Sequence, residues 1–254
     1  AAGILIKGPV TPLIAVLTFL TLCCWERRWR WLAGLRPLVG VPLLLLLVLP
    51  WFLAVTFGRD ASFLAEAANE HIWLKITGGE EGHGAPPGFH LLSHFFFFWP
   101  GALFALPSAI AAWHERRRVP ALRFCLAWLV PAWILFELLP VKLPHYVLPT
   151  YPALALMVAW AVLAEAPALG ARFIRWMQLL LALGALVLAG GMIALPFVLD
   201  HTFIWQSLPA AALILAAAWT AIYLAWQRRR AAALLVGSVL GALWLGWQLG
   251  VYLP

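Results

Sequence analysis

The chain alternates long apolar runs with short polar segments. A membrane-spanning helix needs roughly 20 mostly apolar residues, and about eight stretches meet that requirement. They cover residues 10–24, 38–57, 89–112, 121–140, 145–164, 177–198, 204–226 and 231–252. Lipid offers no hydrogen bonds to the backbone, so spans of this kind form helices, and the period-two alternation of barrel strands is absent. The pattern predicts an all-α, polytopic transmembrane helical bundle.

One polar interval, residues 58–88, is longer than the others. Its first part, from Asp60 to Lys75, is typical of an amphipathic helix that lies on the membrane surface, with Asp60 or Ser62 as its cap. The remainder is rich in glycine and proline, and we expect a loop there. No internal repeat or attached soluble domain is visible, so residues 1–254 are predicted to form a single transmembrane domain that carries this loop.

Composition supports membrane insertion, and the charge distribution predicts its orientation. Hydrophobic residues make up 65% of the chain and charged residues only 11%, against about a quarter in soluble domains. The net charge of +7 could indicate nucleic-acid binding, but every arginine except Arg59 falls in alternate loops. The positive-inside rule places these basic loops in the cytoplasm. We interpret the arginines as topology signals and headgroup anchors, and expect no nucleic-acid partner.

All three lysines lie in the opposite, luminal set of loops, where positive charge is disfavoured. Lys7 stands in "KGP" and Lys142 in "KLP", each just before an apolar run. Proline suits the first helical position, and the free amides and dipole at that end of a helix attract anions. A lysine two residues earlier adds a full charge beside them. These motifs predict a phosphate or pyrophosphate site at the headgroup level. The alternative is that the lysines only extend to the membrane interface.

Acids and histidines on the same face supply further candidates. Glu70, Glu80 and Glu81 could perform acid–base chemistry or bind a cationic group, although solvated loop acids are common. His90 and His94 share a helix face and, together with His83 and Glu80, raise the possibility of a divalent metal. No known ligand signature matches, so no cofactor is predicted. Glu137 lies near the luminal end of a span, where a carboxylate needs no partner, and it is also a candidate to line a cavity.

Three stretches resemble a known family. They are "KGPV" (7–10), "EHIWLKITGGEEGHGAPPGFH" (70–90) and "KLPHYVLPTYPALAL" (142–156). They are similar to the bacterial aminoarabinose-transferase and protein O-mannosyltransferase group, which are GT-C fold glycosyltransferases that use polyprenyl-phosphate sugars. The family often has arginines at the positions of Lys75 and Gly84, and paired aromatics where Phe89 and His90 stand. These departures leave the sugar and the acceptor open.

The resemblance implies a reaction on the periplasmic face of a bacterial inner membrane. A sugar passes from a polyprenyl-phosphate donor to a lipid (lipid A-like), glycan or protein acceptor by inverting displacement. The residues implied to bind the donor phosphate are Lys7, Lys75 and Lys142. The residues implied to bind substrate are Glu70, His71, His83, His145 and Tyr146.

The resemblance also bears on the catalytic base. The family's catalytic aspartate sits in a first luminal loop that no position here matches, so Asp60 and Glu70 are the only local substitutes. The chain is therefore expected to be the C-terminal membrane part of such an enzyme. A transporter or flippase of anionic lipids or lipid-linked sugars is the alternative, because it could use the same phosphate site.

Overall fold

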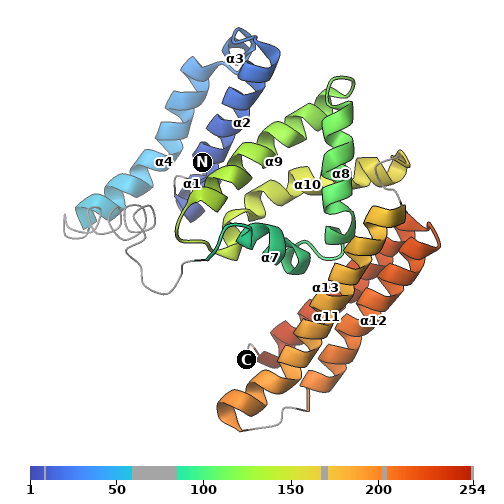
Figure 1. Cartoon of the computed structure of the whole chain (residues 1–254). Coiled ribbons are helices and arrows are strands. Elements are labelled where there is room, and N and C mark those ends of the chain that lie inside the picture. Colours follow the sequence, from blue (N-terminus) through green and yellow to red (C-terminus); the bar gives the residue numbers. More distant parts are fainter. Residues whose placement is uncertain (9, 59–84, 167–170, 202–204, 253–254) are drawn as a thin grey trace. The chain divides into compact units, whose positions relative to one another are not determined.

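The computed structural model describes residues 1–8, 10–58, 85–166, 171–201 and 205–252 (Figure 1). The helices of these residues are α1 (Ala2–Lys7), α2 (Val10–Glu26), α3 (Trp31–Gly34), α4 (Pro37–Gly58), α7 (Phe89–Phe97), α8 (Ala102–Glu115), α9 (Pro120–Leu138), η2 (Pro144–Tyr146), η3 (Leu148–Thr150), α10 (Tyr151–Leu163), α11 (Ala171–Asp200), α12 (Ser207–Trp226) and α13 (Arg230–Tyr252). The expected all-α architecture is confirmed. The expected surface helix at 60–75 lies outside the described residues.

Six stretches of the described chain are long and apolar enough to cross a membrane. They are Pro37–Ala54, Pro120–Leu138, Pro144–Leu163, Phe173–Val198, Ser207–Trp226 and Arg230–Gly250. The expected first span corresponds to α2, a shorter apolar helix of 17 residues. The expected third span, 89–112, divides into α7 and α8. The six stretches fall at the positions of six of the eight predicted spans, and the other two predicted spans correspond to the shorter α2 and to the divided α7 and α8.

Prolines account for two interruptions of the expected helices, the break between α7 and α8 and the short turns before α10. A proline lacks an N–H and disfavours helical conformation in the residue before it. Pro100 lies between α7 and α8, and Pro144 and Pro149 lie in the two short 3₁₀ turns that precede α10. Pro131 stands inside α9 without ending it, as is common in membrane helices.

The described residues form two compact units. Their boundaries along the chain fall inside α7 after His90, between α8 and α9 after Arg118, and inside α10 after Ala153. In the first unit, Ala1–His90 with Val119–Ala153, α2 packs against α9 and α1 contacts α2 and α4. Arg123 in the first turn of α9 forms an ion pair of 2.8 Å with Glu26, the last residue of α2. These two helices are therefore antiparallel.

The second unit contains Leu91–Arg118 and Leu154–Pro254. Here α11, α12 and α13 lie side by side, and α8 packs against α11 (Figure 1). Leu103, Phe104 and Leu181 are almost fully buried in its core. Gly237 on α13 lies directly against Pro100, because a Cβ there would be 2.8 Å from the proline ring.

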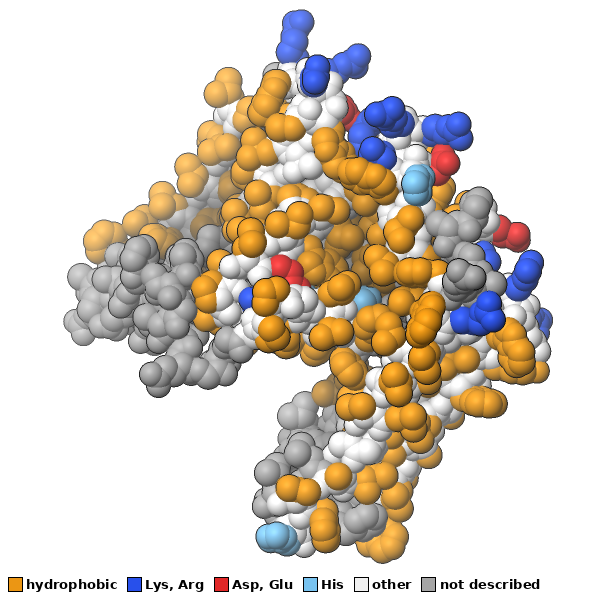
Figure 2. Space-filling view, in the orientation of Figure 1, with side chains coloured by type: hydrophobic (Ala, Val, Ile, Leu, Met, Phe, Trp, Pro, Cys, Tyr) orange, Lys and Arg blue, Asp and Glu red, His pale blue; other side chains and the backbone are white. Residues whose placement is uncertain are grey.

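The outer surfaces of the helices are apolar. Large hydrophobic side chains stay exposed along whole helices, and no residue of the α4 window Pro37–Ala54 is buried. Figure 2 shows hydrophobic side chains over most of the visible surface of the helices. Soluble proteins rarely expose contiguous apolar patches larger than a few hundred Å². The exposed apolar helices and their lengths identify a membrane protein.

Candidate functional site

Glu137, near the end of α9, caps the start of α7. Its carboxylate accepts hydrogen bonds from the backbone N–H of Gly88 (3.1 Å) and of His90 (2.9 Å). Gly88, at φ +92°, precedes the helix and brings no side chain that could cap it. The first amides of a helix have no partner within the helix, so an acceptor from another element replaces the missing local cap. A carboxylate there is also favoured by the helix dipole.

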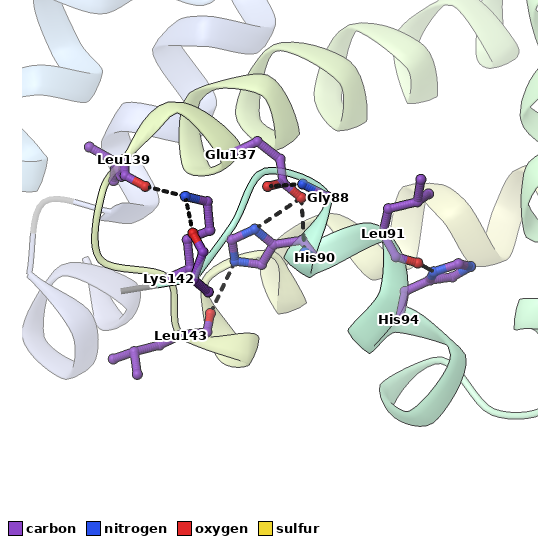
Figure 3. Close-up of polar contacts among 9 residues, drawn as sticks. Gly88, His90, Leu91, His94, Glu137, Leu139, Lys142 and Leu143 are labelled. Atoms are coloured by element: carbon purple, nitrogen blue, oxygen red, sulfur yellow. Dashed lines mark hydrogen bonds and ion pairs between the residues drawn. The ribbon is translucent and has the colours of Figure 1, made fainter. Parts of the chain in front are cut away.

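The imidazole of His90 is completely buried and faces an oxygen atom on each side. Nε2 lies 3.2 Å from the carbonyl oxygen of Leu143, and Nδ1 lies 3.4 Å from Oε1 of Glu137 (Figure 3). The first distance is that of a hydrogen bond in which Nε2–H donates. The second is an ion-pair contact without hydrogen-bond geometry. The ring therefore lies between a backbone carbonyl and a carboxylate.

Lys142 is buried beside this pair, with only 6% of its surface exposed. Its Nζ donates to the carbonyl oxygens of Ala85 (2.9 Å) and Leu139 (2.8 Å). Leu139 follows the last residue of α9, and Ala85 lies 57 residues before Lys142 in sequence. The ammonium therefore joins the chain just before α7 to the chain just after α9. An ammonium has three N–H donors, and these two bonds leave one for a further acceptor.

The three side chains bond to the same two stretches of backbone, and we call them together the Glu137–His90–Lys142 clamp. It holds residues 85–90, the return arm of the long interval, against residues 137–143 (Figure 3). All of these residues belong to the first unit. The clamp thus brings together the ends of two stretches that carry the family resemblance. The polar groups of the clamp hold the backbone at the end of α9 in a fixed position, and an anionic group could bind beside it.

The structure places some of the predicted site residues near the clamp. Pro144 opens η2 at its first turn, so the proline of "KLP" does begin a helical turn, although a 3₁₀ turn and not the long helix. His145 is exposed. The buried ring of Tyr146 packs against Phe136 at 5.5 Å between ring centroids.

Other predicted residues are placed elsewhere or lie outside the described chain. Lys7 is the last residue of α1, so the expectation of a loop residue there is wrong; α2 begins at Val10 as expected. Predicted site residues outside the described part are Asp60, Glu70, His71, Lys75, Glu80, Glu81 and His83.

The two described histidines of the metal hypothesis both contact backbone oxygens. Nδ1 of His94 contacts the carbonyl oxygen of Leu91, and Nε2 of His90 contacts that of Leu143. Within residues 1–8, 10–58, 85–166, 171–201 and 205–252, no group of three His, Cys, Asp or Glu side chains lies close enough to hold a metal. His83, the third histidine of the hypothesis, lies outside these ranges.

Sequence reasoning missed the role of Glu137. It treated this carboxylate as solvated and in need of no partner, but the structure gives it two backbone amides and a histidine. Two signals could have indicated the contact. The first is a lone acid in the apolar run "WILFELLP", and the second is the start "PPGFH" of α7, which has no Ser, Thr, Asp or Asn to cap it.

Comparison with known proteins confirms the resemblance. Over 233 residues the chain is 36% identical to the undecaprenyl phosphate-alpha-4-amino-4-deoxy-L-arabinose arabinosyl transferase of Pseudomonas paraeruginosa, an overlap of 88% of this chain and 40% of the relative. The transferase of the same name from Pseudomonas aeruginosa strain PAO1 is 38% identical over 164 residues, 63% of this chain and 29% of the relative. That of Pectobacterium carotovorum is 28% identical over 210 residues, 79% of this chain and 36% of the relative.

These relatives are longer than the chain, which spans about two fifths of their length or less. No family model and no solved structure matches it. The chain is therefore a relative of the aminoarabinose transferases over most of its own length.

Proposed function

We propose that this chain works as part of a membrane glycosyltransferase that takes its sugar from a polyprenyl phosphate. The observation that carries the proposal is the 36% identity over 88% of the chain to an undecaprenyl phosphate-aminoarabinose arabinosyl transferase. The clamp supports it, because it joins segments from the two longest stretches that resemble this group. The donor in this proposal is undecaprenyl phosphate-aminoarabinose or a related lipid-linked sugar.

In the proposed reaction the bond between the anomeric carbon and the donor phosphate breaks. A new bond forms between that carbon and an acceptor hydroxyl, with inversion, and the hydroxyl proton passes to a base. The acceptor is a lipid of the lipid A type, with a glycan or protein as the alternatives. The reaction takes place on the periplasmic face of the inner membrane, where the positive-inside rule puts the loops that contain the lysines.

The clamp provides a phosphate site in this proposal. Charge grows on the leaving phosphate in the transition state, so donors fixed beside it accelerate the reaction. Lys142 has one N–H left after its bonds to Ala85 and Leu139. The carboxylate of Glu137 and the ring of His90 hold the neighbouring backbone in place, which makes them positioning residues. The exposed His145 is a further candidate to contact phosphate or sugar.

The function is tested in the complete gene product, purified and placed in vesicles with undecaprenyl phosphate-aminoarabinose and lipid A. A transferase yields glycosylated acceptor and free undecaprenyl phosphate, and the product has the inverted anomeric configuration. A flippase equilibrates the donor across the vesicle membrane and forms no product. Movement of the donor without product would refute the proposal in favour of transport.

The phosphate site is tested by Lys142→Ala, with Arg118→Ala as the matched control, because the Arg118 side chain is 84% exposed. A hydrogen bond to a charged group contributes about 1.5–3 kcal/mol, so we expect undecaprenyl phosphate to bind Lys142→Ala at least about tenfold more weakly. Binding should be unchanged in the control. Equal binding by both variants would remove Lys142 from the phosphate site and leave the transferase proposal standing.

A further inference from the structure

A polar hollow lies within the second unit, on the side of the basic loops. It has a volume of about 760 Å³, within the roughly 300–1,000 Å³ of small-molecule sites. Its lining comes from the end of α10 and from the turn between α12 and α13. The polar lining residues are Glu165, Arg228, Arg229 and Arg230, and the apolar ones are Val162, Leu163, Ala166, Ala231 and Ala232. Three guanidinium groups thus stand against one carboxylate.

The arginines are not needed to cap the helix ends that they adjoin. The carbonyls of the last turns of α10 and α12 already accept backbone amides, Ala166 N to Ala161 O at 3.0 Å and Arg229 N to Leu224 O at 2.9 Å. Arg118 pairs with Glu115 and Arg123 with Glu26, whereas Arg228 and Arg229 form no ion pair with the residues that the structure describes. Their charge is available to a ligand.

The backbone conformation at this hollow also indicates that the Arg228 side chain has a role beyond forming the turn. Arg228 has φ +61°, and Glu165 in the other turn has φ +48°. Helices that end in this conformation usually place glycine there, because a Cβ costs about 1–2 kcal/mol in the left-handed region. Glycine at position 228 would close the turn at lower cost. The turn itself therefore does not explain an arginine at this position.

The hollow lies where three membrane-length helices end. The apolar windows finish at Leu163 and at Trp226, and the third starts at Arg230. That is the level of lipid headgroups. Figure 2 shows basic side chains gathered at the end of this unit where α12 joins α13, with hydrophobic side chains along the helices away from it. Basic pockets between membrane helices bind anionic headgroups, and guanidinium groups match phosphate oxygens in pairs.

We propose that this hollow binds the phosphate headgroup of an anionic phospholipid from the leaflet of the basic loops. The excess of positive lining charge favours an anionic lipid over a zwitterionic one. The apolar lining of Val162, Leu163 and Ala231 contacts the upper part of the acyl chains. This site is separate from the donor phosphate proposed at Lys142, and it needs no transferase activity to be measured.

The test is native mass spectrometry of the complete purified gene product with phosphatidylglycerol or phosphatidylcholine. The variant is Arg228→Gln with Arg229→Gln, and the matched control is Arg117→Gln with Arg118→Gln, an exposed pair in another basic loop that removes the same charge. A basic residue at a membrane surface contributes about fivefold in affinity, so we expect the loss of two to weaken phosphatidylglycerol binding by roughly thirty-fold in the variant. The control should change by less than about threefold.

Three results would overturn the proposal. Equal losses in both variants would indicate a diffuse basic surface, and equal binding of the two lipids by the unaltered protein would remove the charge selectivity. Displacement of the lipid by an equal concentration of inorganic phosphate would make the ligand a free anion. If the glutamine variant fails to fold, Arg228→Lys with Arg229→Lys replaces it. The lysines keep the positive charge that orients the loop in the membrane, but they lack the paired N–H donors of a guanidinium group. This variant should still bind at least about fivefold more weakly than Arg117→Lys with Arg118→Lys.

Discussion

Glu137→Gln tests whether the clamp depends on a carboxylate at the end of α9. The carboxylate uses one oxygen for the amide of Gly88 and the other for the amide of His90. A glutamine has one carbonyl oxygen, so it can accept one of these bonds, and its NH₂ group then faces the other backbone N–H. The side chain keeps its length and shape, which confines the change to the hydrogen bonds.

The expected cost follows from the lost bond. A hydrogen bond to a charged group contributes about 1.5–3 kcal/mol, and Glu137 is only 18% exposed. Local opening at the start of α7 should become more favourable by that amount. Since 1.4 kcal/mol corresponds to a factor of ten, amide exchange at Gly88 and His90 should accelerate about 10- to 150-fold.

Hydrogen exchange of the complete protein in nanodiscs measures this directly, in peptides that cover residues 85–97. Glu26→Gln is the control, because Glu26 is a carboxylate of the same unit that pairs with Arg123 and has no part in the clamp. Exchange at 85–97 should be unchanged in the control. If exchange is equally slow in Glu137→Gln while α9 remains protected, Glu137 does not hold the start of α7.

Two further predictions concern packing and topology. Gly237→Ala would place a methyl group 2.8 Å from the Pro100 ring, so overpacking should destabilise the protein by about 1–3 kcal/mol in thermal unfolding. Gly246→Ala is the control and should be nearly neutral, because a Cβ at Gly246 meets open space. Equal melting temperatures of the two variants would contradict the close contact between Gly237 and Pro100. A cysteine at Gly79 should react with an impermeant maleimide added to the periplasmic side of intact cells, whereas one at Arg118 should react only after the membrane is opened; the reverse pattern would invert the proposed orientation.

Much of the fold was predictable because apolar length is a direct physical requirement of the bilayer. The run from 121 to 140 matches α9, Pro120–Leu138, within two residues at each end. The break in the third span was harder to predict, because its apolar composition continues through Trp99 and Pro100. Hydropathy measures composition and does not show where a helix ends. Proline rules contained that information.

The site was predictable only in part. Lysine on the disfavoured face of the membrane singled out Lys142, and the structure shows it buried in a polar network. Its partners are backbone carbonyls of Ala85 and Leu139, which sequence cannot reveal, because every residue carries a carbonyl. The contact of Glu137 with His90 joins residues 47 apart and depends on tertiary structure. The contact could have been suggested only by matching the start of α7, which has no capping side chain, with an acid that has no apparent partner in the sequence.

The capping of α7 by Glu137 imposes an order on biosynthesis. The acceptor for the first amides of α7 lies 47 residues downstream of His90, and ribosomes add about 5–20 residues per second. The helix start therefore waits for roughly 2–10 s before its cap has even been made. During that interval water or the insertion machinery must satisfy those amides. The start of α7 can take its final structure only after α9 has entered the membrane.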